Sequence, residues 1–406
     1  MLYIQIIPTF VAIKSNPIIN KTSTAIMKKK TALFASCLLG TLAFSSCEKN
    51  LYDESKQPEK ETQMTDLVVP SNFDWSDTQE AKAQITPAEA IVSVYLDKEC
   101  KDESLLFRKD MNIETVMEFP LAIPSYAENV YVKYKGVEGV SIVPVQDGKI
   151  SIKAPQTKNT KSRVAVSTSS DNDIVRGMGT VMFEDMYPQL GDYDFNDFVA
   201  WYKLEVPCRH SQEKLYADKM YISVQVRAIG GIYKYEPYIR LAKVKADNII
   251  IESTEVKSII AGPNGEAIIS YKTPTLPEGY KYYNTEKDKM IKPDEFKKIE
   301  ITFKAPIDYE DVLDLHHRID MYIAKENHKQ EIHLKGYESL YGQHQDYADK
   351  NNFVWGIRTS GFIYHVAEGQ NFLKAYPKFK EWVTSGGTEN RLWWDEVDTR
   401  YIIINK

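Results

Sequence analysis

The sequence predicts a mainly β protein with two antiparallel β-sandwich or jelly-roll domains and one C-terminal helix packed on the second domain. Two observations carry this prediction. Tyr, Val and Ile recur in short runs in which apolar and polar residues alternate, as they do in half-buried strands. These runs follow one another at short spacing with little helical periodicity between them, which is typical of antiparallel sandwiches.

Length and charge narrow the class of protein. The chain has 406 residues, which is enough for two or three domains of roughly 100–200 residues each. Its formal net charge is −6, and no basic patch marks a nucleic-acid partner. The sequence therefore argues against a nucleic-acid-binding protein.

The beginning of the chain carries a targeting signal. Met27, the expected start residue, is followed by three lysines, residues 28–30. Residues 31–44 are apolar or small, and Ser45-Ser46 immediately precedes Cys47. Residues 27–46 thus resemble the signal peptide of a bacterial lipoprotein, which implies that Cys47 is acylated and becomes the first mature residue. The apolar run is shorter than the ~20 residues of a membrane span. Residues 1–26 are expected to be a mis-assigned upstream extension.

A polar segment, residues 47–70, follows the signal peptide. It is rich in charged residues and lacks periodicity, so we expect a flexible tether. Glu48 and Lys49, rather than aspartate, follow the cysteine; by resemblance to Gram-negative lipoproteins this favours the outer membrane, with the body exposed at the cell surface.

Residues 71–155 are predicted to form an N-terminal β-sandwich. Asp147-Gly148 lies between two alternating runs and predicts a tight hairpin turn. A linker at residues 156–177 is rich in Lys, Thr, Ser and Asn, with an edge strand at 163–166. The strands expected in the sandwich are 91–96, 130–134, 141–145 and 149–152.

Residues 178–406 are predicted to form the second β domain. Phe198, Ala200 and Tyr202 alternate with more polar neighbours, so this strand has one apolar face. The strands expected in this domain are 198–206, 220–227, 248–252, 266–271, 298–303, 319–324, 331–334 and 401–404.

One helix is predicted near the end of the chain. Apolar residues between Phe372 and Val383 fall on one stripe at helical spacing. Pro377 interrupts the stripe, so the regular helix is expected to begin there. Gly386-Gly387 is expected to cap its C-terminus.

The most informative stretch is an acidic loop between two apolar runs. So many like charges repel one another unless a cation neutralises them, and a hard cation such as calcium takes several oxygen ligands. We therefore predict a calcium site, with Phe183, Phe195 and Phe198 anchoring the loop to the core. The predicted ligands are Glu184, Asp185, Asp192, Asp194, Asn196 and Asp197.

The loop can also be compared with other metal sites, with a catalytic site and with a turn that binds no metal. It is not an EF-hand, because Asp197 stands where the motif has glycine and Lys203 where it has a bidentate glutamate. Zinc is disfavoured, because no His or Cys lies in the motif. A catalytic carboxylate pair is usually held apart across a cleft. A hydrogen-bonded acidic turn without metal remains an alternative.

Aromatic and histidine residues suggest further sites. Trp355, Trp393 and Trp394 could stack on sugar rings as a ligand face, together with the tyrosines of segment 233–238, or they could fill the core. Adjacent histidines, residues 316–317, point to opposite faces of a strand, so they are poor partners in one metal site.

One histidine and two cysteines are expected to have structural surroundings without a special site. His333 is expected to be buried and hydrogen-bonded rather than catalytic. Cys100 and Cys208 lie in different predicted domains, so a disulfide is possible but not implied, and both resemble buried small hydrophobes.

Residues 183–199, with their Phe-Glu-Asp and Gly-Asp-Tyr-Asp-Phe-Asn-Asp-Phe-Val segments, resemble the signature of the LruC-type domain of bacterial surface lipoproteins. Three later segments, 227–231, 331–334 and 375–382, resemble the family in the same order, and the Trp393-Trp394 pair follows them. The resemblance covers roughly residues 175–406. It implies a calcium-stabilised β domain at the cell surface with no established enzyme activity.

Taken together, the sequence predicts a non-enzymatic outer-membrane lipoprotein that acts as a binding or adhesion module. Its expected partners are the membrane, through the lipid at Cys47, and a glycan or a surface protein. The alternatives are a surface hydrolase acting on glycans and a structural protein of the envelope.

Overall fold

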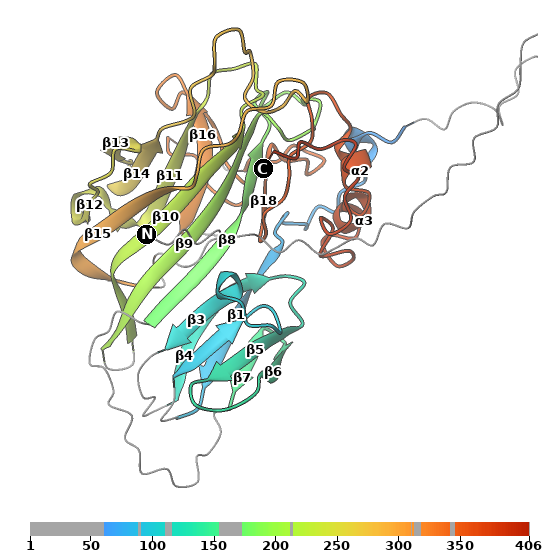
Figure 1. Ribbon diagram of the computed structural model, residues 1–406. Helices are drawn as coiled ribbons and strands as arrows, with labels where there is room; N and C mark the ends of the chain where they lie inside the picture. Colours follow the sequence, from blue (N-terminus) through green and yellow to red (C-terminus); the bar gives the residue numbers. More distant parts are fainter. Residues whose placement is uncertain are drawn as a thin grey trace, which may run out of the picture. The chain divides into compact units, whose positions relative to one another are not determined.

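Nearly all of the regular structure is β-strand, as the alternating pattern predicts (Figure 1). The computed structural model describes residues 61–87, 91–109, 116–153, 173–211, 214–309, 311, 318–341 and 346–405. These residues belong to one compact unit, Glu61–Lys406. The predicted signal peptide, Cys47, the edge strand at 163–166 and residues 316–317 lie outside the described part of the chain.

The larger sheet has 13 strands among the described residues. They are Thr78–Ile85 (β1), Val92–Tyr95 (β2), Leu105–Lys109 (β3), Met117–Pro124 (β4), Asn129–Tyr134 (β5), Ser141–Gln146 (β6), Lys149–Ile152 (β7), Asp173–Phe183 (β8), Phe198–Ser211 (β9), Lys214–Ala228 (β10), Ile249–Ile250 (β12), Lys297–Asp308 (β15) and Gly356–Thr359 (β18). The strand order is β12-β15-β10-β9-β8-β3-β2-β5-β6-β7-β1-β4, and β18 pairs with β8.

Strands β1–β7 form the first part of this sheet. Strand β6 pairs with both β5 and β7, and β1 pairs with β7 in parallel, the exception to the antiparallel arrangement that the sequence predicts. The predicted hairpin is confirmed, because Asp147 and Gly148 both have positive φ (49° and 68°) between β6 and β7.

Strands β8, β9, β10 and β15 run side by side as long antiparallel neighbours (Figure 1). The pairing of β8 with β9 runs from Asp173, opposite Cys208, to Phe183, opposite Phe198. The acidic loop is therefore the connection at one end of this pair. Strand β8 begins at Asp173, inside the segment that the sequence assigns to the linker.

The smaller sheet has five strands in the order β13-β14-β11-β16-β17. Its members are Glu236–Lys245 (β11), Val256–Ala261 (β13), Glu266–Tyr271 (β14), Ile319–Lys325 (β16) and Gln330–Ile332 (β17). All four pairings in this sheet are antiparallel. Strand β14 is buried along its whole length.

Some predicted and observed strands differ. Strands β1, β3, β4, β8, β11, β13 and β18 were not predicted. Charged residues, prolines or glycines interrupt their apolar pattern, as Pro237 and Lys243 do in β11. Residues 401–404 contribute an isolated bridge, Val366 opposite Ile402, instead of a full strand. The reason is that their neighbour is an irregular segment rather than a strand.

Two short helices replace the single predicted helix: Phe372–Ala375 (α2) and Phe379–Thr384 (α3). Pro377 separates them, because proline lacks an N–H and disfavours helical geometry in the residue before it. The predicted glycine cap is confirmed. The N–H of Gly387 donates to the Trp382 carbonyl (2.8 Å), and Gly386 has a φ of 64°.

Residues 61–75 pack against these helices. Met64, Leu67, Phe73 and Trp75 are buried in a cluster with the aromatic residues of α2 and α3. The Phe73 ring lies edge-on to Trp382, 4.9 Å between centroids. The described end of the predicted tether, residues 61–70, therefore belongs to the folded body, because its apolar side chains complete this core.

Two further observations complete the fold. Within the described residues, no helix is both long and apolar enough to cross a bilayer. Cys100 and Cys208 are both free thiols; Cys208 is buried and Cys100 is partly exposed.

Candidate metal centre

The acidic loop folds back on the end of β8. Tyr193 and Phe195 both adopt positive φ (56° and 52°), which turns their backbone N–H groups inward. These groups donate to Glu184, from Tyr193 to Oε2 (3.2 Å) and from Phe195 to Oε1 (2.6 Å). Phe183, Phe195 and Phe198 are buried, at most 3% exposed, so the predicted anchoring of the loop is confirmed.

Three carboxylates converge inside this loop. Glu184, Asp192 and Asp194 each offer an oxygen, and these oxygens lie within 4.8 Å of one another. Glu184 and Asp194 are almost fully buried, whereas Asp192 is exposed. The cluster therefore has two buried members and one at the surface.

Asp194 is also tied to the segment before α2. Its Oδ2 accepts a hydrogen bond from the N–H of Gly369 (2.9 Å) and another from Asn196 Nδ2 (2.7 Å). Asn196 Nδ2 donates as well to the carbonyl of Val366 (3.2 Å). The loop is thus fixed against residues 366–369, which lie far from it in the sequence.

Asp185 and Asp197 do not belong to the three converging carboxylates and form hydrogen bonds with other parts of the chain. The N–H of Asp185 donates to Asp197 Oδ2 (2.7 Å), and Asp185 Oδ2 accepts from the N–H of Tyr233 (2.7 Å). The N–H of Gly230 donates to the Asp197 carbonyl (3.1 Å). These two aspartates therefore connect the loop to the segment after β10.

Burial and mutual repulsion raise the pKa values of the loop carboxyls. Burial, followed by the neighbouring Asp192, raises the pKa of Asp194 to about 9. Burial and the nearby Asp185 raise the pKa of Asp197 to about 8. Burial, then Asp197 and Asp194, raises the pKa of Glu184 well above its ordinary value. Without a cation these groups would hold protons at neutral pH.

Glu368 is a member of the site that the sequence did not reveal. Burial and the nearby Asp192 raise its pKa, and its Oε2 is buried without a hydrogen-bond partner among the described residues. Asn196 Oδ1 is likewise buried and unpartnered. Glu368 carries no local motif, so only the folding of the chain brings it to the loop.

Two glycines next to the loop have no room for a side chain. A Cβ at Gly230 would lie 2.3 Å from Asn196 Oδ1, and one at Gly231 would lie 2.5 Å from Asp185 Oδ2. Their signal was present in the sequence, as the Gly-Gly pair of segment 227–231. Gly191 is restricted in the same way, because its Cβ would lie 2.5 Å from Glu184 Oε2.

The tryptophans proposed as a ligand face are core residues. Trp355 is 1% exposed and donates from Nε1 to the carbonyl of Gln189 (2.8 Å). Trp393 is 0% exposed, between the rings of α2 and α3. Trp394 is partly exposed and lies edge-on to Tyr126. Trp355 and Trp393 therefore do not present their rings to a ligand, and the core interpretation holds for both.

A family model and a solved structure are similar to this chain. Residues 217–394 match the model of a domain of unknown function (DUF4842). A Bacteroides ovatus protein whose crystal structure is described as that of a "putative lipoprotein" is similar in fold, with a TM-score of 0.63 and 20% sequence identity. The likeness covers 79% of this chain and 100% of that one. No curated protein matches the chain in sequence.

The solved structure gives information about the fold, and the family model gives information about residues 217–394. At 20% identity, the likeness to the Bacteroides ovatus structure shows a shared fold. The matching family model carries a description other than that of the LruC-type domain, so that resemblance stays a prediction.

Proposed function

We propose that this protein is a lipid-anchored cell-surface protein whose β body is stabilised by calcium and serves as a binding or adhesion module. The observation that carries the proposal is the convergence of Glu184, Asp192 and Asp194, whose oxygens lie within 4.8 Å of one another. Crowded, largely buried carboxylates are strongly unfavourable as anions unless a cation lies among them.

The chemistry of the donors favours calcium. The converging groups are all carboxylates, which are hard oxygen ligands, and no His or Cys takes part in the cluster. Asn196 Oδ1 and Glu368 Oε2 are further unpartnered, buried oxygens in the same region. Calcium accepts six to eight oxygens in flexible geometry, so it suits an irregular loop better than magnesium or zinc does.

The expected role of the ion is structural. Glu184 directly follows β8, and Asp194 accepts a hydrogen bond from the N–H of Gly369, just before α2. A cation held by these residues stabilises the contact between the sheet and the C-terminal segment. Because an ion that binds only the folded state stabilises it by mass action, the stability of the body depends on the free calcium concentration.

A calorimetric titration tests this role. The purified mature protein is stripped with EDTA and titrated with calcium or magnesium, and its melting temperature is measured with and without each ion. We expect one saturable calcium site and a higher melting temperature with calcium. Asp194→Asn should remove both effects. Asp218→Asn, which changes a surface carboxylate paired with Arg209, should leave both unchanged. Identical melts with calcium and with EDTA would refute the proposal.

The anchor is proposed at Cys47 in the outer membrane. It is supported by the lipobox-like segment before Cys47 and by the likeness in fold to a protein described as a lipoprotein. Metabolic labelling with a fatty acid and membrane fractionation check it. Wild-type protein should carry label in the outer-membrane fraction, whereas Cys47→Ala should be unlabelled. Label retained by the variant would contradict the assignment.

A binding role is proposed in preference to catalysis. His333, the histidine in the family-like segment, is 0% exposed and cannot reach a substrate, and the acidic groups crowd one loop instead of facing each other across a cleft. Arrays of glycans and of surface proteins, probed with calcium-loaded and EDTA-treated protein, test the partner class. Turnover of chromogenic glycosides, lost in Asp194→Asn, would favour the hydrolase instead.

A further inference from the structure

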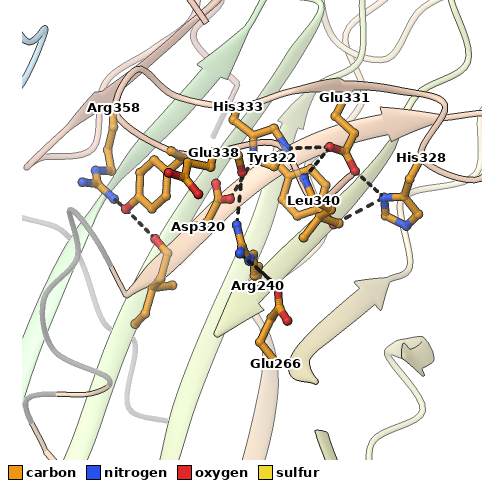
Figure 2. A network of polar contacts seen from close by, with 12 residues as sticks. Arg240, Glu266, Asp320, Tyr322, His328, Glu331, His333, Glu338, Leu340 and Arg358 are labelled. Carbon is orange, nitrogen blue, oxygen red and sulfur yellow. Dashed lines mark hydrogen bonds and ion pairs between the residues drawn. The ribbon is translucent and has the colours of Figure 1, made fainter. Parts of the chain in front are cut away.

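A second polar cluster lies within the smaller sheet (Figure 2). His333, just after β17, is 0% exposed and lies between two carboxylates. Its Nδ1 is 2.7 Å from Asp320 Oδ2, and its Nε2 is 3.3 Å from Glu331 Oε2. Asp320 belongs to β16 and Glu331 to β17, so the ring connects two strands of the sheet.

This geometry determines the protonation state of the ring. An ionised carboxylate can accept a hydrogen bond but has no proton to donate. Both ring nitrogens of His333 face carboxylate oxygens, so when both carboxylates are ionised both nitrogens carry hydrogen, and the ring is an imidazolium. Asp320 Oδ1 has no partner among the described residues, so His333 is the hydrogen-bond donor on which that buried charge depends.

The surrounding groups leave few other sources of positive charge. Arg240 of β11 pairs with Glu266 of β14 (Nη2–Oε1 2.9 Å) and donates to the Glu338 carbonyl (3.1 Å). His328, in the turn before β17, lies with Nδ1 3.2 Å from Glu331 Oε1. Three carboxylates thus face one guanidinium and two histidine rings, and the ring of His333 is the one that contacts both Asp320 and Glu331.

The remaining groups around the ring are tyrosines and one backbone amide. The Tyr322 ring stacks on His333 at 4.2 Å between centroids, and the Tyr347 ring lies 4.9 Å away. The N–H of Leu340 donates to Glu331 Oε2 (2.9 Å). His333 is therefore at the junction of β16, β17 and the segment around residue 340.

We propose that His333 is a proton-binding site that clamps β16, β17 and the segment around Leu340 together, and that alkaline pH opens this clamp. With the proton in place, the ring donates a hydrogen bond to each carboxylate, its single positive charge offsets part of their negative charge, and the junction is closed. When the proton leaves, one ring nitrogen turns a lone pair towards a carboxylate, and Asp320 or Glu331 becomes a buried, uncompensated charge. The junction then separates to admit water.

The same molecule provides an internal contrast. His365 is also 0% exposed, but its Nε2 donates to a backbone carbonyl, that of Asn284 (2.5 Å), and its Nδ1 has no partner among the described residues. No carboxylate contacts this ring in the described structure. Two equally buried histidines therefore differ in charge because of their neighbours: His333 is an imidazolium and His365 a neutral imidazole.

Nitrogen NMR of the histidine rings in the folded mature protein tests the inference. At about pH 8, where an ordinary histidine with a pKa near 6.5 is neutral, His333 should still carry protons on both nitrogens and His365 on one. As the pH is raised further, the Leu340 amide signal should shift with the same midpoint as the His333 ring. A His333 ring with a bare nitrogen at pH 8, or a Leu340 amide that ignores the ring titration, would overturn the clamp.

A matched pair of variants distinguishes the effect of the Glu331 charge on the His333 titration from an effect of side-chain packing. Glu331→Gln keeps an acceptor for Leu340 but removes one of the two charges, so the midpoint of the ring titration should fall by at least about one pH unit, a tenfold weaker hold on the proton. Glu338→Gln changes an exposed carboxylate of the same segment and should leave the midpoint in place. Equal midpoints in both variants would refute the role of Glu331.

Discussion

The acidic loop predicts an unusual dependence of stability on pH, which calcium should abolish. Without a cation, Asp194 and Asp197 have pKa values of about 9 and about 8 in the folded state, against about 3.9 in an unfolded chain. Between these limits the folded state binds more protons than the unfolded state. Raising the pH through this window therefore lowers the free energy of unfolding of the calcium-free protein.

The size of the effect follows from the two groups. Each contributes about 1.4 kcal/mol per pH unit, so from pH 5 to 6.5 the loss is about 4 kcal/mol at most. With an unfolding entropy of about 2.1 cal/mol/K per residue, that corresponds to about 6 °C in melting temperature for a unit of this length.

Other groups titrate in the same window. Burial raises the pKa values of Glu184, Asp185 and Glu368, which adds to the loss from the two groups. Burial also raises the pKa of Asp77 to about 7 and lowers that of His365 to about 4, and these two shifts act in opposite directions on stability as the pH rises. The pKa of Glu331 is about 2, and His333, whose pKa is raised by Asp320 and Glu331 despite its burial, loses stability only above about pH 6.5.

Differential scanning calorimetry at pH 5 and 6.5, with EDTA or with millimolar calcium, measures the effect. The melting temperature should fall with rising pH in EDTA and stay level or rise in calcium. The double variant Asp194→Asn with Asp197→Asn cannot titrate at these positions, so in EDTA its melting temperature should fall less with rising pH than that of the wild type, and calcium should not raise it. A wild-type protein that gains stability from pH 5 to 6.5 in EDTA would refute the reasoning.

Three further predictions test the scaffold. Trp75→Ala, at a site 4% exposed among the rings of α3, should cost about 3–5 kcal/mol in urea unfolding; a loss below about 1 kcal/mol would mean that residues 61–75 do not complete the core. Lys109→Met removes the cation paired with buried Asp173 (Nζ–Oδ2 2.7 Å), so it should cost about 3–5 kcal/mol, and adding Asp173→Leu should recover much of it. Gly230→Ala, with its Cβ 2.3 Å from Asn196 Oδ1, should weaken calcium binding at least about tenfold; unchanged affinity in a calorimetric titration would contradict that crowding.

The candidate site was only partly visible in the sequence. The crowding of carboxylates in one loop pointed to a cation, and the interleaved phenylalanines pointed to an anchored loop. The sequence did not show that three side chains converge, while Asp185 Oδ2 accepts a hydrogen bond from the N–H of Tyr233 and the carbonyl of Asp197 accepts one from the N–H of Gly230. Those bonds depend on where β10 ends in space, and local spacing carries no information about that.

The sequence by itself determined the elements whose signals are local: alternating strands such as β5 and β7, the Asp147-Gly148 turn, the glycine cap after α3 and the oxygen-rich loop. Only the tertiary structure decided that Glu368 lies beside Asp192, that residues 61–75 complete the helical core, and that His333 lies between two carboxylates. The physical reason is the distance along the sequence over which each interaction acts. Periodicity and turn chemistry act over a few residues, whereas burial, charge neutralisation and hydrogen-bond satisfaction depend on neighbours that only the folded chain brings together.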